Sequence, residues 1–204
     1  MPSTLKTGTR MQQFKINEIF YSLQGEGFFT GVPSIFIRFS GCNLHCPFCD
    51  TAHRQGTLMN IEDIINEICK YPASHIVLTG GEPSLFINEE FVSALKSKGK
   101  FIAIETNGTH EIPSNINWIT LSPKFEFCNA DNAFPVIQEC NELKVVYSGQ
   151  DLSIYNQFHA DHYFLQPCDM SDREQNNRII TSTINACLTD PKWRLSLQVH
   201  KFLG

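Results

Sequence analysis

The chain has 204 residues, a formal net charge of −5 at pH 7 and 42% hydrophobic residues. This length suffices for one domain with a substantial core, and a mild negative charge without basic runs argues against nucleic acid or an anionic membrane as a partner. The chain has no apolar stretch that approaches the roughly 20 residues of a spanning helix, and its polar first residues form no signal peptide. We therefore expect a cytoplasmic protein, in which eight cysteines favour metal binding or catalysis over disulfides.

The chain contains no internal repeat, low-complexity segment or linker. We expect a flexible N-terminal tail over residues 1–10 and a single domain over residues 11–204. Short apolar runs predict strands over residues 16–21, 35–39, 75–79, 101–106, 118–121, 142–147 and 162–167, with 195–198 as a further candidate. Apolar residues at helical spacing predict helices after the N-cap Asn60, around Phe91 and over about 172–188, with a weakly helical stretch at 151–158.

This alternation of strands and helices favours a parallel sheet built from right-handed βαβ units, which is an α/β fold. About six main strands are expected, fewer than the eight that close a (β/α)8 barrel. We therefore expect a partial (incomplete) TIM-type barrel whose chemistry lies at the C-terminal ends of the strands.

Three cysteines, Cys42, Cys46 and Cys49, follow the expected strand 35–39 with the spacing C-x3-C-x2-C. Thiolates are soft ligands that suit iron–sulfur clusters, zinc or copper(I). A usual [4Fe–4S] cluster takes four thiolates, so three would leave one iron open to a substrate or cosubstrate. This spacing resembles the signature of the radical S-adenosylmethionine (SAM) enzymes, in which the open iron chelates the amino and carboxylate groups of SAM.

A structural zinc site is the main alternative. Tetrahedral zinc needs four nitrogen or sulfur ligands, and His45 or His53 could supply the fourth. The remaining cysteines provide no second closely spaced pair: they are Cys69, Cys128, Cys140, Cys168 and Cys187. Zinc therefore stays the second hypothesis, and a disulfide framework is weaker still.

Other polar residues follow or interrupt expected strands. The glycines of LQGEG at 23–27 either let the backbone approach a ligand or form a plain turn. Arg38 interrupts an apolar strand and needs a partner, either an internal carboxylate or a substrate carboxylate. Gly80 and Gly81 of GGEP leave backbone groups accessible, which suits the polar amino-acid end of a cofactor.

Several of these stretches together resemble the 7-carboxy-7-deazaguanine synthase family within the radical SAM superfamily. The cysteine spacing alone indicates only the superfamily, whereas LQGEG, the CDT ending of the cysteine motif and the short chain point to this family. The stretches that carry the resemblance span residues 22–27, 31–33, 36–38, 41–51, 79–83, 105–108, 122–124 and 198–201.

The resemblance implies a lyase of queuosine (7-deazapurine) biosynthesis. Its reaction would be the radical SAM ring contraction of 6-carboxy-5,6,7,8-tetrahydropterin to 7-carboxy-7-deazaguanine, with loss of ammonia. The implied cofactors are a [4Fe–4S] cluster, SAM and Mg²⁺, and the implied partners are a flavodoxin or ferredoxin electron donor and a second copy in a homodimer. A glycyl-radical activase, which shares the cluster motif, is the alternative enzyme class.

The resemblance also implies roles for individual residues, while the radical chemistry itself is left to SAM and the cluster. The implied cluster ligands are Cys42, Cys46 and Cys49, and the implied magnesium ligand is the hydroxyl of Thr51. The implied SAM-binding residues are Phe48, Cys49, Asp50, Gly81, Ser122, Pro123 and Lys124. The implied substrate-binding residues are Leu23, Gln24, Gly25, Arg38, Thr79 and Gly204.

Overall fold

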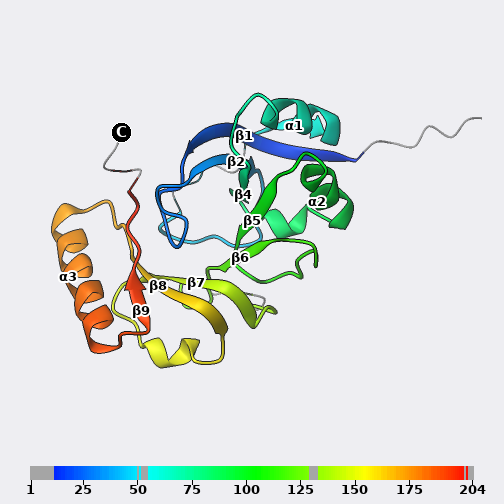
Figure 1. The fold of residues 1–204 in the computed structure, drawn as a ribbon. Helices are drawn as coiled ribbons and strands as arrows, with labels where there is room; N and C mark the ends of the chain where they lie inside the picture. Colours follow the sequence, from blue (N-terminus) through cyan, green and yellow to red (C-terminus); the bar gives the residue numbers. More distant parts are fainter. Residues whose placement is uncertain (1–11, 50, 52–54, 129–132, 200, 202–204) are drawn as a thin grey trace, which may run out of the picture.

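The computed structural model describes residues 12–49, 51, 55–128, 133–199 and 201, so the expected tail over residues 1–10 lies outside the described residues. Strands of the described chain form one sheet in the order β3-β1-β2-β4-β5-β6-β7-β8-β9 (Figure 1). The strands are β1 (Gln13–Leu23), β2 (Pro33–Phe39), β3 (Thr57–Asn60), β4 (His75–Gly80), β5 (Phe101–Thr106), β6 (Trp118–Leu121), β7 (Glu139–Tyr147), β8 (His159–Pro167) and β9 (Trp193–Leu195). The helices are α1 (Ile61–Ile68), α2 (Glu89–Lys96) and α3 (Arg173–Thr189), with 3-10 turns η1 (Pro83–Leu85) and η2 (Leu152–Tyr155).

The sheet is mixed and open. Strands β2 and β4 to β9 run parallel, whereas β1 pairs antiparallel with both β2 and β3. The sheet ends at β3 and β9, which are not neighbours in the strand order, so the barrel is incomplete. The predicted α/β partial barrel is confirmed, with seven parallel strands in the described chain where about six were expected.

Three elements differ from the expectation. Strand β1 pairs antiparallel with its neighbours, whereas a parallel sheet was expected. Strand β3 was not expected, and it exists because residues 57–60 pair with the first residues of β1. The last strand was placed too late in the sequence, since β9 pairs with β8 through Trp193 and Leu195. The chain after Leu195 leaves the sheet, because Ser196 Oγ accepts a hydrogen bond from Gly27 N at 2.9 Å and Val199 N donates to Gly25 O at 3.0 Å.

Asn60 ends β3 and starts α1, which confirms the predicted N-cap. Its side-chain oxygen accepts a hydrogen bond from Asp63 N at 2.9 Å, and Asp63 Oδ2 accepts one from Asn60 N at 3.4 Å. This reciprocal capping box satisfies two backbone donors at a helix start. The helix boundary is therefore fixed by local chemistry that the sequence displays.

Helices cover the outer side of the curved sheet (Figure 1). Helix α1 packs against β1 and β3, α2 packs against β5, and α3 packs against β8 and β9. The first core cluster lies under α1 and α2 and includes Ile37, Leu78, Ile104, Phe91 and Leu95. The second lies near η2 and α3 and includes Leu143, Val145, Leu165, Tyr155 and Trp193. None of the described helices is long and apolar enough to cross a membrane.

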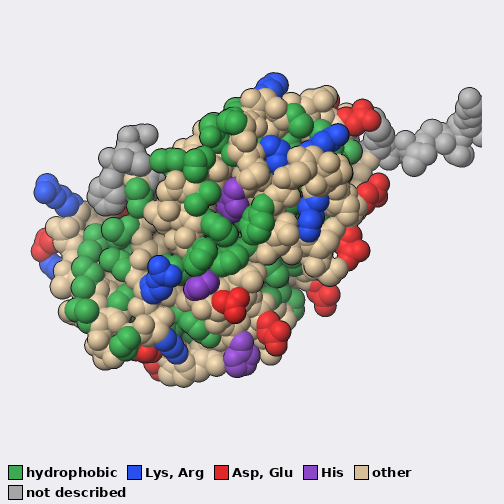
Figure 2. Space-filling model, viewed as in Figure 1, with side chains coloured by type: hydrophobic (Ala, Val, Ile, Leu, Met, Phe, Trp, Pro, Cys, Tyr) green, Lys and Arg blue, Asp and Glu red, His purple; other side chains and the backbone are tan. Residues whose placement is uncertain are grey.

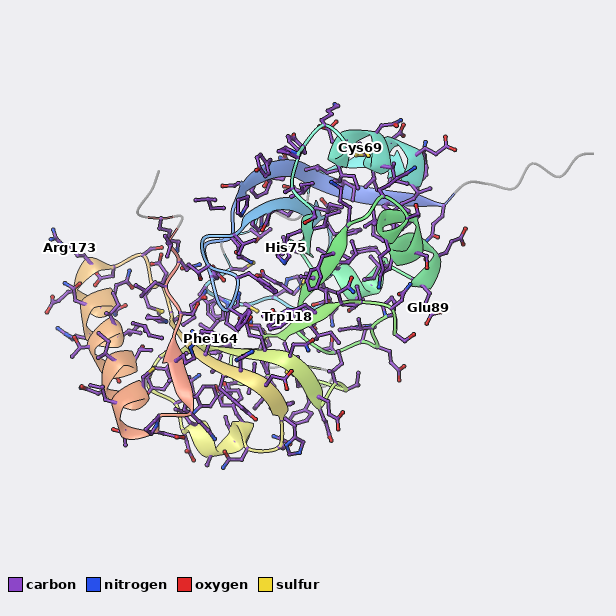
Figure 3. The ribbon with its side chains drawn as sticks, viewed as in Figure 1. Cys69, His75, Glu89, Trp118, Phe164 and Arg173 are labelled. Carbon is purple, nitrogen blue, oxygen red and sulfur yellow. The ribbon has the colours of Figure 1, made fainter. Side chains whose placement is uncertain are left out.

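The loop between β1 and β2 closes the end of the partial barrel where the parallel strands begin. Phe28 stacks on Trp118 and on His162, with ring centroids 4.8 and 4.4 Å apart. Phe29 packs on His75 and on Trp118, at 4.5 and 4.7 Å. Figure 3 shows His75 and Trp118 in the middle of the molecule, and Figure 2 shows hydrophobic and histidine side chains gathered there. We call this group of rings the aromatic plug. The opposite end of the sheet, where the parallel strands end, is therefore the one available for a polar site.

Candidate functional site

A cavity of about 750 Å³ opens where the parallel strands end. It is lined by the residues that follow β1, β2, β4, β5, β6 and β8, together with side chains from β7 and the segment after β9. The sequence-predicted residues that line it are Leu23, Gln24, Gly25, Arg38, Cys42, Cys46, Phe48, Cys49, Thr51, Thr79, Gly81, Ser122 and Lys124.

Of the predicted site residues that the structure describes, Pro123 is not among those that line the cavity, and it is buried. Asp50 and Gly204 lie outside the described residues. The cavity nevertheless brings the predicted cluster, SAM, magnesium and substrate residues together at one end of the sheet, as expected for chemistry at strand C-termini.

The cysteine loop follows β2 directly. Cys42 and Cys46 are half-buried and Cys49 is exposed. Leu44 N donates a hydrogen bond to Cys42 Sγ at 3.4 Å, a contact that would favour a thiolate there. Burial raises the pKa of the Cys42 thiol, and burial raises that of Cys46 to about 12. Metal binding must therefore displace protons from these two thiols.

The same thiols also bear on the proposed cluster. Among the described side chains, no group of three or more His, Cys, Asp or Glu residues is arranged to hold a single metal ion. The thiolates of a cubane bind separate irons, and Cys42, Cys46 and Cys49 line one cavity, which is compatible with a cubane. His53 lies outside the described residues.

The GGEP loop is locked against the cysteine loop. Gly81 N donates to Phe39 O and Glu82 N donates to Gly41 O, both at 2.9 Å. A Cβ on Gly81 would lie 1.9 Å from the Gly41 carbonyl oxygen, so a side chain there would force the two loops apart. Glycine at this position follows from the close approach of two backbones.

Glu82 ties this loop to the end of β5. Its buried carboxylate accepts hydrogen bonds from Thr106 Oγ1 and Asn107 N, both at 2.7 Å. Asn107 Nδ2 in turn donates to Asn43 Oδ1 of the cysteine loop at 3.1 Å. The ends of β2, β4 and β5 thus form one rigid wall of the cavity.

Lys124 and Ser122 form the neighbouring wall after β6. Lys124 Nζ donates to Ser122 O at 2.8 Å, and Ser122 N donates to Thr106 O at 2.8 Å. Burial lowers the pKa of Lys124, which the Cys46 thiolate would partly oppose. An anion entering the cavity near Lys124 would meet a partly desolvated cation.

A buried ion network in the cavity was missed by sequence reasoning. Lys144 is only 5% exposed, and its Nζ lies 2.6 Å from Glu26 Oε2 and 3.3 Å from Glu105 Oε1. Glu105 also accepts hydrogen bonds from Gln24 Nε2 at 3.0 Å and Thr79 Oγ1 at 3.1 Å. A lysine inside the apolar run 142–147 was the available signal, because a buried cation needs partners just as Arg38 does.

Charge balance in this network determines its protonation. Burial alone would lower the pKa of Lys144, but Glu105, Glu26 and Glu142 together raise it above its ordinary value. Burial raises the pKa of Glu142, although Lys144 and a hydrogen bond from Phe28 N at 3.2 Å both act to lower it. The network therefore carries a charged ammonium group at neutral pH.

Arg38 has the internal partner that the sequence left open. Its Nε lies 2.8 Å from Glu18 Oε1, and the two side chains are 25% and 50% exposed. Arg38 also lines the cavity, so its guanidinium is placed at the cavity wall by a partly solvated ion pair. The geometry of a guanidinium permits a second, bidentate partner.

Residues 36–119 match the Radical SAM superfamily. Together with the partial barrel and the cysteine loop, this match defines the chain as a radical SAM protein. The chain is 52% identical to the 7-carboxy-7-deazaguanine synthase of Bacteroides thetaiotaomicron, over 93% of this chain and 97% of the relative. It is 38% identical to the 7-carboxy-7-deazaguanine synthase of Haemophilus influenzae, over 94% and 93% of the two chains.

A solved structure agrees with these relatives. The crystal structure of QueE from Escherichia coli superposes with a TM-score of 0.72 at 32% identity, covering 92% of this chain and 95% of that one. The chain belongs to the 7-carboxy-7-deazaguanine synthase family.

The buried network gives a test of stability against pH. Burial already raises the folded-state pKa of Glu142, and Lys144→Met removes the cation that opposes this shift. A carboxyl group whose pKa is raised on folding costs stability once it ionises, so the variant's stability deficit grows as pH rises from about 4.5, the ordinary pKa of glutamate. We expect a loss of about 3 kcal/mol near neutral pH, measured by anaerobic urea unfolding at about pH 5 and about pH 8.

The matched control is Lys70→Met, which removes an exposed lysine paired with Glu67. Its stability should stay close to that of the parent chain at both pH values. Equal, pH-independent losses of stability in the two variants would contradict this expectation, because they would show that removing Lys144 leaves no buried carboxylate without a partner.

Proposed function

We propose that this chain converts 6-carboxy-5,6,7,8-tetrahydropterin to 7-carboxy-7-deazaguanine with loss of ammonia, as a radical SAM lyase of queuosine biosynthesis. The observation that carries the proposal is one cavity lined both by three loop thiols and by a network of carboxylates, amides and cations. The names of relatives at 52% and 38% identity support the reaction.

The thiols of Cys42, Cys46 and Cys49 would hold a [4Fe–4S] cluster with one open iron. When bound, the cluster and SAM supply a carbon-centred radical that abstracts hydrogen from the substrate. The chain itself supplies binding and orientation. Its rigid wall of hydrogen-bonded strand ends limits movement of whatever lies between the thiols and the carboxylates.

SAM would lie along the walls next to the cysteine loop. The backbone near Gly81 is accessible to an amino group, and Lys124 with Ser122 offers donors for the carboxylate or ribose region. Phe48 lines the cavity and packs edge-on against Phe127, with centroids 4.8 Å apart, so it is positioned for an adenine contact. Cys49 and Asp50, at the end of the motif, and Pro123 complete the proposed set.

The pterin would occupy the part of the cavity that holds the buried network. A pterin carries a pyrimidine edge with adjacent N–H donors. A carboxylate such as that of Glu105 or Glu26 can accept hydrogen bonds from these donors. Gln24, Thr79 and the backbone at Gly25 supply further polar contacts, and Leu23 supplies an apolar one. Arg38 is the proposed partner of the substrate carboxylate, and Gly204 is a proposed further contact.

Magnesium is proposed at Thr51, whose side chain lines the cavity beside Cys49. A hydroxyl oxygen is a hard ligand that suits Mg²⁺, and the ion would keep waters and bind a substrate carboxylate.

Three further assignments complete the proposal. A flavodoxin or ferredoxin would deliver the electron, and the exposure of Cys49 supports access to the cluster from the surface. The enzyme would act as a homodimer, as the family resemblance implies. A cytoplasmic location is proposed because a reducing compartment favours metal binding or catalysis over disulfides in a chain with eight cysteines.

The direct test is an anaerobic assay of the reconstituted protein with SAM, a reductant, Mg²⁺ and carboxytetrahydropterin. We expect 7-carboxy-7-deazaguanine and ammonia in equal amounts. SAM cleavage by an intact cluster without deazaguanine would contradict the proposal and favour a glycyl-radical activase.

Arg38→Ala tests the contact with the substrate carboxylate. Loss of a charge-assisted bidentate pair should raise KM roughly 10–100-fold, with iron content unchanged. Glu18→Ala is the control, because it removes the same ion pair while keeping the guanidinium. Equal KM values for the two variants would show that Arg38 acts only through its ion pair with Glu18 and does not bind the substrate.

Thr51→Ala tests the magnesium site. The stimulation of turnover by added Mg²⁺ should weaken several-fold in this variant, because one hard oxygen ligand is lost. Thr181→Ala on α3 is the matched control, because the Thr181 hydroxyl donates a hydrogen bond to Asn177 O of its own helix. If turnover responds to Mg²⁺ equally in the parent chain, Thr51→Ala and Thr181→Ala, Thr51 is not a magnesium ligand.

A further inference from the structure

A fourth cysteine reaches the cysteine loop from another part of the chain. Cys128 follows the turn after Lys124, and Cys128 N donates to Lys124 O at 3.2 Å. Its Sγ lies 3.5 Å from Cys46 Sγ, although the two residues are 82 positions apart. This distance is within the range of a hydrogen bond between sulfur atoms.

The contact lies in an apolar environment. Cys128 is 7% exposed and forms a small core cluster with Leu44 and Ala133, against which Phe125, Cys42 and Cys46 pack. Buried cysteine often acts simply as a small hydrophobic residue. Here, however, the sulfur faces a proposed cluster ligand, and a low local dielectric strengthens any hydrogen bond between them.

The chemistry of the bound state fixes the direction of this hydrogen bond. An iron-bound Cys46 thiolate has no hydrogen, so it can only accept, and Cys128 must donate. A ligand role for Cys128 does not fit, because thiolates that bind different irons of one cubane are farther apart than these two sulfurs. Cys128 is therefore placed as a neighbour of the cluster rather than as its fourth ligand.

We propose that the Cys128 thiol donates a hydrogen bond to Cys46 Sγ and thereby raises the reduction potential of the cluster. Reduction adds negative charge to the cluster and its sulfurs, and a donor to sulfur stabilises the reduced state more than the oxidised state. Cys128 would thus be a positioning and tuning residue that makes the cluster easier for the electron donor to reduce. The inference rests on the proposed cluster but not on the identity of the substrate.

The test compares midpoint potentials of reconstituted proteins by redox titration monitored with electron paramagnetic resonance, with and without SAM. Cys128→Ala should shift the midpoint to a more negative value at unchanged iron content. Cys128→Ser keeps a donor and should return the midpoint toward that of the parent chain. Cys69→Ala, at the periphery beyond α1 (Figure 3), is the matched control and should leave the midpoint unchanged.

An unshifted midpoint in Cys128→Ala would overturn the proposal. If the alanine variant loads too little iron to titrate, Cys128→Val supplies a larger side chain that is not a donor, and the same criterion applies. If neither variant holds iron while Cys128→Ser does, Cys128 is needed for cluster assembly, which also overturns the tuning role. A parent chain that assembles no cluster would instead contradict the proposed function.

Discussion

One buried ammonium group connects the parts of the chain that form the cavity. Lys144 on β7 binds Glu26 of the β1–β2 loop and Glu105 at the end of β5. Glu26 also accepts a hydrogen bond from Gln198 Nε2 at 3.0 Å, so the segment after β9 joins the same network. Breaking a buried charge pair is costly even where forming it gains little, so these segments are held in one arrangement.

The network is needed because the barrel is incomplete. In a closed barrel, neighbouring strands would fix every loop at the C-terminal end, but here β3 and β9 remain separate edges. The loop between β1 and β2 lies across the interior instead, with the aromatic plug at one end and Glu26 at the other. One segment therefore seals the apolar end and supplies a charged group to the polar end.

The wall formed by the ends of β2, β4 and β5 depends on a close backbone contact and on hydrogen bonds to a buried carboxylate. Gly81 approaches Gly41 so closely that a side chain would not fit, and buried Glu82 joins that loop to Thr106 and Asn107. The thiols of the cysteine loop are thus placed against a rigid surface. The proposed cofactor and substrate residues line the same cavity.

Local signals account for what the sequence could predict. The cysteine spacing, the GGEP turn and the N-cap at Asn60 each involve residues close together in the chain, and the partial barrel follows from alternating strands and helices. Strand β3 and the start of β9 depend on pairing with distant strands, which short segments do not reveal. The partners of Lys144 lie 118 and 39 residues away, and those of Arg38 lie on the antiparallel neighbour β1.

The proposed chemistry requires that three loop thiols hold a cluster with an open iron. The measurement to make is the iron, sulfide and zinc content of anaerobically purified protein, with visible spectra before and after SAM is added. We expect iron and sulfide in the ratio of a [4Fe–4S] cluster and a brown absorbance that SAM perturbs. Zinc without iron, even after reconstitution, would contradict the proposed chemistry.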